Sequence, residues 1–265
     1  MKVDGANVLV TGGSRGIGEA MARQFASQGA RVCVVARSAE ALDRVAADIG
    51  GFALVADLLD ADQVDSLHDR VQAEFGSVDI LVNNAGLDAT DGFLFADPDD
   101  LRNVVRLNLE SSVLLTRHFL PGMVERGKGH LVFTSSLAGT AGFPSLATYG
   151  ATKAGLNNFA ATLRLELQAT NIHTTLVAPG PVDTEMWDAL EDTPYTADLL
   201  KRLRLLQTIP KTNPQKLAKR SVAAVEANRR HVRHPRRLSL TFWLGESPRR
   251  LTELLLAGVK FELPR

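Results

Sequence analysis

The chain has 265 residues, of which 45% are hydrophobic and 23% charged, and its formal net charge is zero. The composition is typical of a soluble protein, and the length suits one large α/β domain or two small ones. One Cys excludes an intramolecular disulfide, no apolar run approaches the roughly 18 residues needed to cross a bilayer, and the start of the chain lacks a secretory signal, so we expect a cytoplasmic protein.

Short apolar runs alternate with helical patterns along the whole chain. We expect strands at 8–10, 32–35, 52–56, 80–82, 131–134 and 174–178, and helices near 16–28, 39–49 and 61–75. Asp97-Pro98 and Asn213-Pro214 each place an N-cap residue before a Pro at the first helical position, which predicts helices that begin there. The second of these helices would end near residue 228, and residues 230–234 would form a last strand.

Such repeated strand-helix-strand units predict an α/β fold, a single Rossmann-type doubly wound parallel sheet with helices on both faces and a C-terminal helical extension. We expect one domain over residues 1–265, with a substrate lid at about 185–212 and a helical tail at about 235–265. Cys33 lies within the second strand, so we interpret it as a small core residue.

A glycine-rich segment directly follows the first strand and opens the first helix. Glycines let the backbone turn tightly and approach a pyrophosphate, and the helix N-terminus offers N–H groups and a favourable dipole. In this strand-loop-helix context the segment predicts a dinucleotide site whose residues are Gly12, Ser14, Arg15, Gly16, Ile17 and Gly18.

The end of the second strand bears on which dinucleotide is bound. An NAD site places an acid here for the ribose 2′-hydroxyl, but the chain has Ala36, followed by Arg37 and Ser38. Two guanidinium groups, from Arg15 and Arg37, suit the 2′-phosphate of NADP(H). Alternatively, Arg37 is a solvated loop charge. After the third strand, Asp57 with Leu58 is a candidate for the adenine, although a bare Asp equally suits a helix cap.

The strongest pattern for chemistry is Tyr149 and Lys153, four residues apart, with Ser136 at the end of an apolar strand. Positions i and i+4 share one helix face, so the ammonium should stabilise the phenolate and lower the Tyr149 pKa. A phenol tuned in this way can give a proton to a carbonyl oxygen or take one from an alcohol. Ser136 would lie where open α/β sheets bind ligands.

With these residues identified, the chain resembles the short-chain dehydrogenase/reductase family over about residues 5–186. The resemblance is carried by ordered motifs, namely the Gly loop 11–18, Asp57, Asn83-Asn84-Ala85-Gly86, Asn108, Ser136, Tyr149, Lys153 and Pro179-Gly180.

The family implies a role for each of these residues. Tyr149 would be the general acid/base, Ser136 would hydrogen-bond the substrate oxygen, Lys153 would bind the nicotinamide ribose, and Asn108 would hold a water that connects Lys153 to solvent. The other implied cofactor contacts are Asn84, Ala85 and Gly86 on the adenosine side, and Pro179, Gly180, Val182 and Thr184 around the nicotinamide and phosphates.

Apolar residues surround the expected substrate end. The lid would supply Met186, Trp187, Leu190, Tyr195, Leu199, Leu200, Leu203, Leu205 and Leu206, and the opposite wall Leu87, Phe93, Leu94, Phe95, Leu137, Phe143 and Leu146. We therefore expect an NADP(H)-dependent oxidoreductase that transfers a hydride between the nicotinamide and a lipophilic carbonyl or secondary alcohol (steroid-, retinoid- or acyl-like). If these residues are simply core, a reductase of small polar carbonyls is the alternative, and a non-catalytic NADP-binding regulator or scaffold is another.

The charge is unevenly distributed, since residues 201–250 contain fourteen Lys and Arg against two Glu, a net +12. Three interpretations stay open, namely contact with an anionic membrane, contact with an acyl carrier or acyl-CoA, and a solvated face. No nucleic-acid motif accompanies the charges. His231 and His234 have no neighbouring ligands, so we expect no metal site. A homodimer through helices near 99–120 and 149–170, or a tetramer, is implied by the resemblance, although the family's glycine-rich C-terminal strand is missing.

Overall fold

The computed structural model describes residues 1–88, 93–187 and 211–234, in which strands and helices alternate along the chain. The strands are β1 (Asn7–Thr11), β2 (Arg31–Ala36), β3 (Phe52–Val55), β4 (Ile80–Asn83), β5 (Gly129–Thr134), β6 (Ile172–Pro179) and β7 (His231–His234). The α-helices are α1 (Gly16–Ala26), α2 (Ala39–Ile49), α3 (Ala61–Glu74), α4 (Pro98–Val105), α5 (Ser111–Glu125), α6 (Ala147–Glu166) and α9 (Pro214–Glu226). A π-helical turn, η1 (Arg106–Glu110), joins α4 to α5, and a 3₁₀ turn, η2 (Leu137–Gly139), follows β5.

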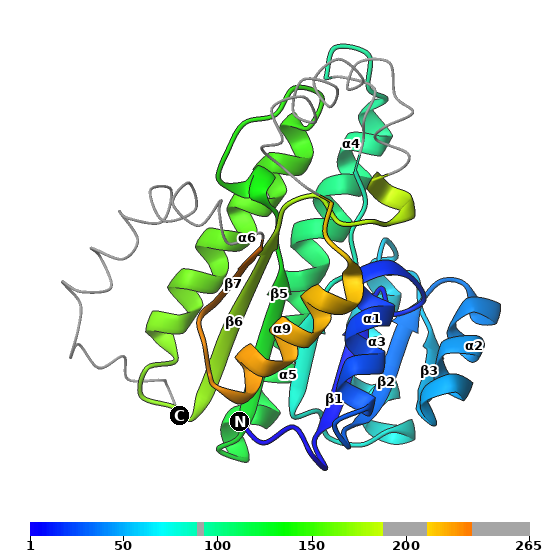
Figure 1. Ribbon diagram of the computed structural model, residues 1–265, viewed down its shortest axis with the longest axis vertical. Coiled ribbons are helices and arrows are strands. Elements are labelled where there is room, and N and C mark those ends of the chain that lie inside the picture. The colour runs from blue at the N-terminus through cyan, green and yellow to red at the C-terminus, as the bar shows by residue number, and fades with distance from the viewer. Residues whose placement is uncertain (89–92, 188–210, 235–265) are drawn as a thin grey trace.

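These strands form one seven-stranded parallel sheet in the order β3-β2-β1-β4-β5-β6-β7 (Figure 1). The order reverses between β1 and β4, which lie side by side although about seventy residues of chain separate them. The predicted doubly wound fold is therefore confirmed, including the last strand. The predicted tail and most of the predicted lid lie outside the described residues.

Both faces of the sheet are buried, and neighbouring residues of a strand point to opposite faces. Val8, Val10 and Val34 pack with α1, α2 and α9 in one core, whereas Leu9 and Cys33 pack with α3, α5 and α6 in the other. Burial also raises the pKa of the Cys33 thiol to about 12, which fits its predicted role as an inert core residue.

The two predicted Asx-Pro helix starts are both present. Asp97 caps α4 by accepting a hydrogen bond from the Asp99 N–H, and Asn213 caps α9 by accepting from the N–H groups of Gln215 and Lys216. Each cap therefore fixes the residue at which its helix begins. In the described part of the chain, no helix is long and apolar enough to cross a membrane.

Candidate active site

The loop between β1 and α1 is built for close approach of the backbone to a ligand. Gly12 has φ +63°, and a Cβ at Gly18 would lie 2.1 Å from the Gly12 carbonyl oxygen. Gly16, at φ +59°, faces the Thr184 side chain. Arg15 is the N-cap of α1 and makes no side-chain capping bond, so the first N–H groups of the helix are left for a ligand. This arrangement suits the phosphates of a dinucleotide.

A polar cluster holds this loop against β4. The Thr11 hydroxyl donates to the Val82 carbonyl oxygen at 3.1 Å and accepts from the N–H groups of Asn84 at 2.9 Å and Ala85 at 3.1 Å. The Asn84 amide in turn donates to the carbonyl oxygens of Thr11 and Gly12 at 3.1 and 3.3 Å. The Asn-Asn-Ala-Gly segment therefore stabilises the glycine loop.

The catalytic candidates come from the next part of the sheet. Ser136 follows β5 and accepts a hydrogen bond from the Ala138 N–H at 3.2 Å, which turns the chain toward α6. The amide of Asn157, on α6, contacts both the Ser135 hydroxyl and the Gly139 carbonyl oxygen. These contacts fix α6, which carries Tyr149 and Lys153, beside the end of β5.

Tyr149 and Lys153 do lie together, but the electrostatics differ from the prediction. The Lys153 Nζ is 5.5 Å from the centroid of the Tyr149 ring and donates to the Thr134 carbonyl oxygen at 2.9 Å. Burial raises the pKa of Tyr149 to about 12, an effect that Asp88 reinforces and a hydrogen bond with Ser136 opposes. The predicted lowering of the Tyr149 pKa is therefore wrong for this arrangement, because desolvation of the phenolate outweighs its stabilisation.

Lys153 itself is 4% exposed. Burial lowers its pKa to about 8, and the negative charge of Asp88 partly opposes this shift. Lys153 thus keeps its charge at neutral pH and loses it in the mildly alkaline range. Its ammonium and the neutral phenol of Tyr149 are presented together.

Asn108 lies behind the site in the π-helical turn η1. Its side-chain oxygen accepts from the Leu87 N–H at 2.9 Å, and its amide donates to the Leu87 carbonyl oxygen at 2.8 Å and to Thr152 Oγ1 at 3.2 Å. A Cβ at Gly86 would lie 3.1 Å from Asn108 Oδ1 and 3.5 Å from Lys153 Nζ, so a larger residue there would press on the Asn108 side chain. Asn108 therefore supports the loop before Asp88, and the water-holding role stays a prediction.

One cavity of about 1060 Å³ runs along the carboxyl ends of the strands. It is lined by most of the predicted site residues, namely Gly12, Ser14, Arg15, Gly16, Ile17, Arg37, Ser38, Asp57, Leu58, Asn84, Ala85, Gly86, Ser136, Tyr149, Lys153, Pro179, Gly180, Val182 and Thr184. Gly18 and Asn108 are the predicted residues that do not line it. Motifs that lie far apart in the sequence, from the glycine loop to the segment after β6, therefore line one cleft.

The segment after β6 closes one side of this cleft. The N–H of Gly180 donates to the His234 carbonyl oxygen, Asp183 donates through its N–H to the Thr212 carbonyl oxygen, and the Thr184 hydroxyl donates to the Val182 carbonyl oxygen at 3.2 Å. This places Thr184 over the glycine loop, consistent with the predicted contact of Thr184 with the phosphates.

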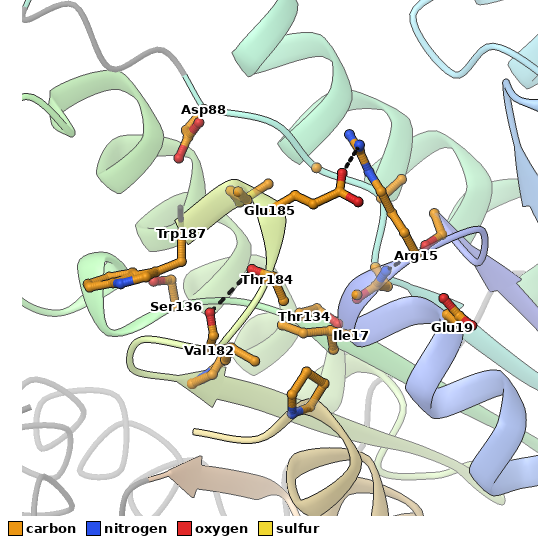
Figure 2. Close-up of a pocket in the computed structure, with 18 of the residues that line it drawn as sticks. Arg15, Ile17, Glu19, Asp88, Thr134, Ser136, Val182, Thr184, Glu185 and Trp187 are labelled. Carbon is orange, nitrogen blue, oxygen red and sulfur yellow. Dashed lines mark hydrogen bonds and ion pairs between the residues drawn. The ribbon is translucent and has the colours of Figure 1, made fainter. Parts of the chain in front are cut away.

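Arg15 differs from its predicted placement. Figure 2 shows its guanidinium extended toward Glu185, with which it forms an ion pair and a hydrogen bond, while Glu19 lies on the other side. The two side chains are 71% and 72% exposed. Arg15 therefore lines the cavity, as expected. Its charge is paired with Glu185, which lies across the cleft in the segment that follows β6.

Sequence reasoning also missed several residues that line the cavity, and three charged ones among them matter for the chemistry. They are Arg44 on α2, Glu185 after Thr184, and Asp88 after the Asn-Asn-Ala-Gly segment. The sequence signal that could have identified Asp88 and Glu185 was their position, because each lies next to a predicted site segment. By contrast, Phe93, Leu94 and Phe95 do not line the cavity and are 67%, 85% and 65% exposed, so their predicted place on the cleft wall is wrong.

Met186, Trp187, Leu137, Phe143 and Leu146 line the cavity as expected, and the remaining predicted lid residues lie outside the described part. Ser38, besides lining the cavity, caps α2 by accepting from the Ala41 N–H at 3.4 Å. Over residues 1–88, 93–187 and 211–234, no group of three His, Cys, Asp or Glu is placed to hold a metal ion.

Comparisons with known proteins agree on one family. A family model described as short chain dehydrogenase matches residues 6–194. An uncharacterized short-chain type dehydrogenase/reductase of Sinorhizobium fredii is 39% identical over 180 residues, covering 68% of this chain and 71% of its own length. The 3-oxoacyl-acyl-carrier-protein reductase FabG of Escherichia coli is 34% identical over 194 residues, covering 72% and 80%. A short chain dehydrogenase/reductase of Burkholderia phymatum, solved with NAD, has the same fold, with a TM-score of 0.81 at 24% identity over 100% and 99% of the two chains.

Proposed function

The chain belongs to the short-chain dehydrogenase/reductase family and is an oxidoreductase with a nicotinamide cofactor, and on this basis we propose that it uses NADP(H) to interconvert a largely apolar ketone and the corresponding secondary alcohol. The observation that carries the proposal is that Ser136, Tyr149 and Lys153 line the same cavity as the glycine loop. A proton donor and a cofactor cradle in one cleft are the two parts that hydride transfer requires.

The side chains divide the chemistry as follows. The nicotinamide supplies or accepts the hydride. Tyr149, whose pKa of about 12 keeps the phenol protonated at neutral pH, donates its proton to the carbonyl oxygen as that oxygen gains charge. The Ser136 hydroxyl donates a hydrogen bond to the same oxygen, and the buried ammonium of Lys153 stabilises the phenolate that remains.

Preference for NADP(H) rests on the end of β2. No acid follows that strand, since Ala36 and Arg37 occupy the positions next to the expected adenosine ribose. Arg44, one turn into α2, lines the same part of the cavity, and its guanidinium lies 3.7 Å from the Glu19 carboxylate. Arg37 and Arg44 together offer the charge for a 2′-phosphate, while Arg15 is engaged with Glu185.

An apolar substrate is supported by the wall next to the catalytic residues. Leu137, Phe143, Leu146, Met186 and Trp187 line the cavity there, and among the residues that the structure describes Lys153 is the only Lys or Arg on that part of the wall. The similarity to FabG, a 3-oxoacyl-acyl-carrier-protein reductase, also favours an acyl-like ketone among such substrates. We propose a ketone with an extended apolar chain.

The test is oxidation of NADPH and of NADH, followed by absorbance, against methyl ketones of increasing chain length. We expect higher kcat/KM with NADPH and a rise in kcat/KM with chain length. Turnover that is best on short polar ketones would contradict the substrate class, and preference for NADH would contradict the cofactor. Tight NADPH binding without turnover of any ketone or alcohol would indicate a non-catalytic regulator instead.

A further inference from the structure

Within the described part of the chain, an acidic side chain, that of Asp88, lies at the substrate end of the cleft close to the catalytic pair. Asp88 follows the Asn-Asn-Ala-Gly segment and lines the same cavity as Ser136 and Tyr149. In Figure 2 its carboxylate projects into the space above Ser136 and Trp187, away from the glycine loop and from the Arg15–Glu185 pair. Asp88 is therefore on the substrate side of the catalytic residues.

Among the described residues, the carboxylate of Asp88 accepts a hydrogen bond from its own backbone N–H and has no side-chain partner. It forms no ion pair or hydrogen bond there with another side chain, and the ammonium of Lys153, which acts on it electrostatically, donates to the Thr134 carbonyl oxygen instead. Asp88 nevertheless acts electrostatically on both Lys153 and Tyr149, so it is close to both. Partial burial raises the pKa of Asp88 to about 6, which leaves the group ionised at neutral pH.

A partly buried carboxylate has several acceptor positions, and those left without a donor carry a free-energy cost. Leu137, Phe143 and Met186 on the neighbouring wall carry no hydrogen-bond donors in their side chains, and the donors nearby are the Trp187 indole N–H and the hydroxyls of Ser136 and Tyr149, which the proposed reaction directs to the substrate oxygen. When it is ionised, the Asp88 carboxylate can accept hydrogen bonds but cannot donate one. The remaining acceptor positions of Asp88 are best filled by a donor on the substrate, close to the carbonyl carbon whose oxygen Tyr149 and Ser136 would contact.

We propose that Asp88 is a specificity-determining residue that accepts a hydrogen bond from a hydroxyl or ammonium group on the substrate, one or two bonds from the reacting carbon. The inference rests on the proposed function and narrows its substrate class to ketones with an apolar chain on one side and a donor group on the other. The same carboxylate disfavours keto acids, because two like charges would be brought together in a poorly solvated cleft.

The test compares three ketones of equal chain length, in which the carbon next to the carbonyl carries a hydrogen, a hydroxyl or an ammonium. Wild-type protein, Asp88→Asn and the control Asp69→Asn are assayed with NADPH and NADH at pH 7.5. Asp69 is an exposed acid on α3 that does not line the cavity, so the control makes the same change in net charge. Binding of each ketone to the protein with oxidised cofactor is measured by titration calorimetry alongside turnover.

We expect the wild type and the Asp69→Asn control to favour a donor-bearing ketone over the unsubstituted one. Asp88→Asn should lower that preference by about 10- to 100-fold, the loss expected for a hydrogen bond to a charged group. A larger loss for the ammonium probe than for the hydroxyl probe would identify a cationic substrate, and the reverse a neutral one.

The calorimetry separates this inference from the proposed function. Preferential binding of a donor-bearing ketone, lost in Asp88→Asn, supports the role of Asp88 even if no ketone is turned over, in which case only the proposed reaction fails. If the three ketones bind with equal affinity, if none binds, or if Asp88→Asn keeps the wild-type preference, the role of Asp88 is overturned.

Discussion

The buried ammonium of Lys153 donates a 2.9 Å hydrogen bond to the carbonyl oxygen of Thr134, the last residue of β5. This bond ties α6 to the end of the strand that precedes Ser136. It also holds a positive charge within 5.5 Å of the Tyr149 ring centroid, where the phenolate formed by proton transfer would lie. The fold therefore places the Lys153 charge where it can stabilise the phenolate, although it does not lower the pKa of the resting Tyr149 phenol.

The first prediction concerns Tyr149→Phe, which removes the proton donor and keeps the ring. We expect kcat for ketone reduction to fall by about 100- to 10,000-fold, the usual contribution of a general acid. Cofactor titration by fluorescence should still show binding, because the glycine loop and β2 end are unchanged. Turnover at the wild-type rate would exclude Tyr149 as the acid.

The second prediction concerns alkaline pH. The Lys153 pKa of about 8 means that the cation is lost as the pH rises through 8, so kcat/KM for reduction should fall above that pH. The negative charge of Asp88 raises the Lys153 pKa, and Asp88→Asn should therefore move the alkaline limb to lower pH. An alkaline limb at the same pH in both proteins would show that Lys153 and Asp88 are not coupled.

The third prediction concerns cofactor choice. Removal of the Arg37 guanidinium in Arg37→Ala should raise KM for NADPH by about 10- to 100-fold and change KM for NADH much less, since only NADPH has the 2′-phosphate. Arg44→Ala should act in the same direction. Arg102→Ala, an exposed arginine on α4 paired with Asp99, is the control. Equal effects on the two cofactors would remove Arg37 from the phosphate site.

The fourth prediction concerns the Arg15–Glu185 pair. Glu185→Gln releases Arg15, whose charge can then act on the cofactor phosphates, and we expect a lower KM for NADPH. Both partners are mostly exposed, so the free energy of unfolding should change by less than about 1 kcal/mol. Glu125→Gln, at the end of α5, is the control for loss of one negative charge. An increase in KM would mean that the pair organises the cleft instead of competing for Arg15.

The fifth prediction concerns His130, which is 0% exposed in β5 and contacts the Thr175 hydroxyl at 2.8 Å. Burial, aided by His173, lowers its pKa to about 3 from the ordinary 6.5. Between pH 6.5 and pH 3, His130 is therefore protonated in the unfolded chain and neutral in the folded chain. The free energy of unfolding falls as the pH drops through this range. At pH 5 the loss is about 2 kcal/mol relative to neutral pH.

Urea unfolding at pH 7.5 and pH 5 measures this effect. The loss of stability between the two pH values should be smaller in His130→Leu by about that amount, even if the variant is less stable at both. His68→Gln, which changes a partly exposed histidine beside Asp69, serves as the control. An unchanged pH dependence in His130→Leu would show that other groups are responsible.

Much of this fold was predictable because its signals are local. Apolar runs marked the strands, and the Asp97-Pro98 and Asn213-Pro214 pairs marked helix starts through caps that involve neighbouring residues only. The π-helical turn that carries Asn108 had no such local signal. The exposure of Phe93, Leu94 and Phe95 was also not predicted, because hydrophobicity alone does not determine which side chains are buried.

The sequence by itself determined the doubly wound sheet, the glycine loop and the placing of Tyr149 and Lys153 on one helix face, since each depends on residue spacing along the chain. Only the tertiary structure decided that Glu185 pairs with Arg15, that Asp88 faces the catalytic residues, and that the Tyr149 pKa rises instead of falling. These three outcomes depend on desolvation and on contacts between residues far apart in the chain, and both quantities exist only once the strands and loops are assembled.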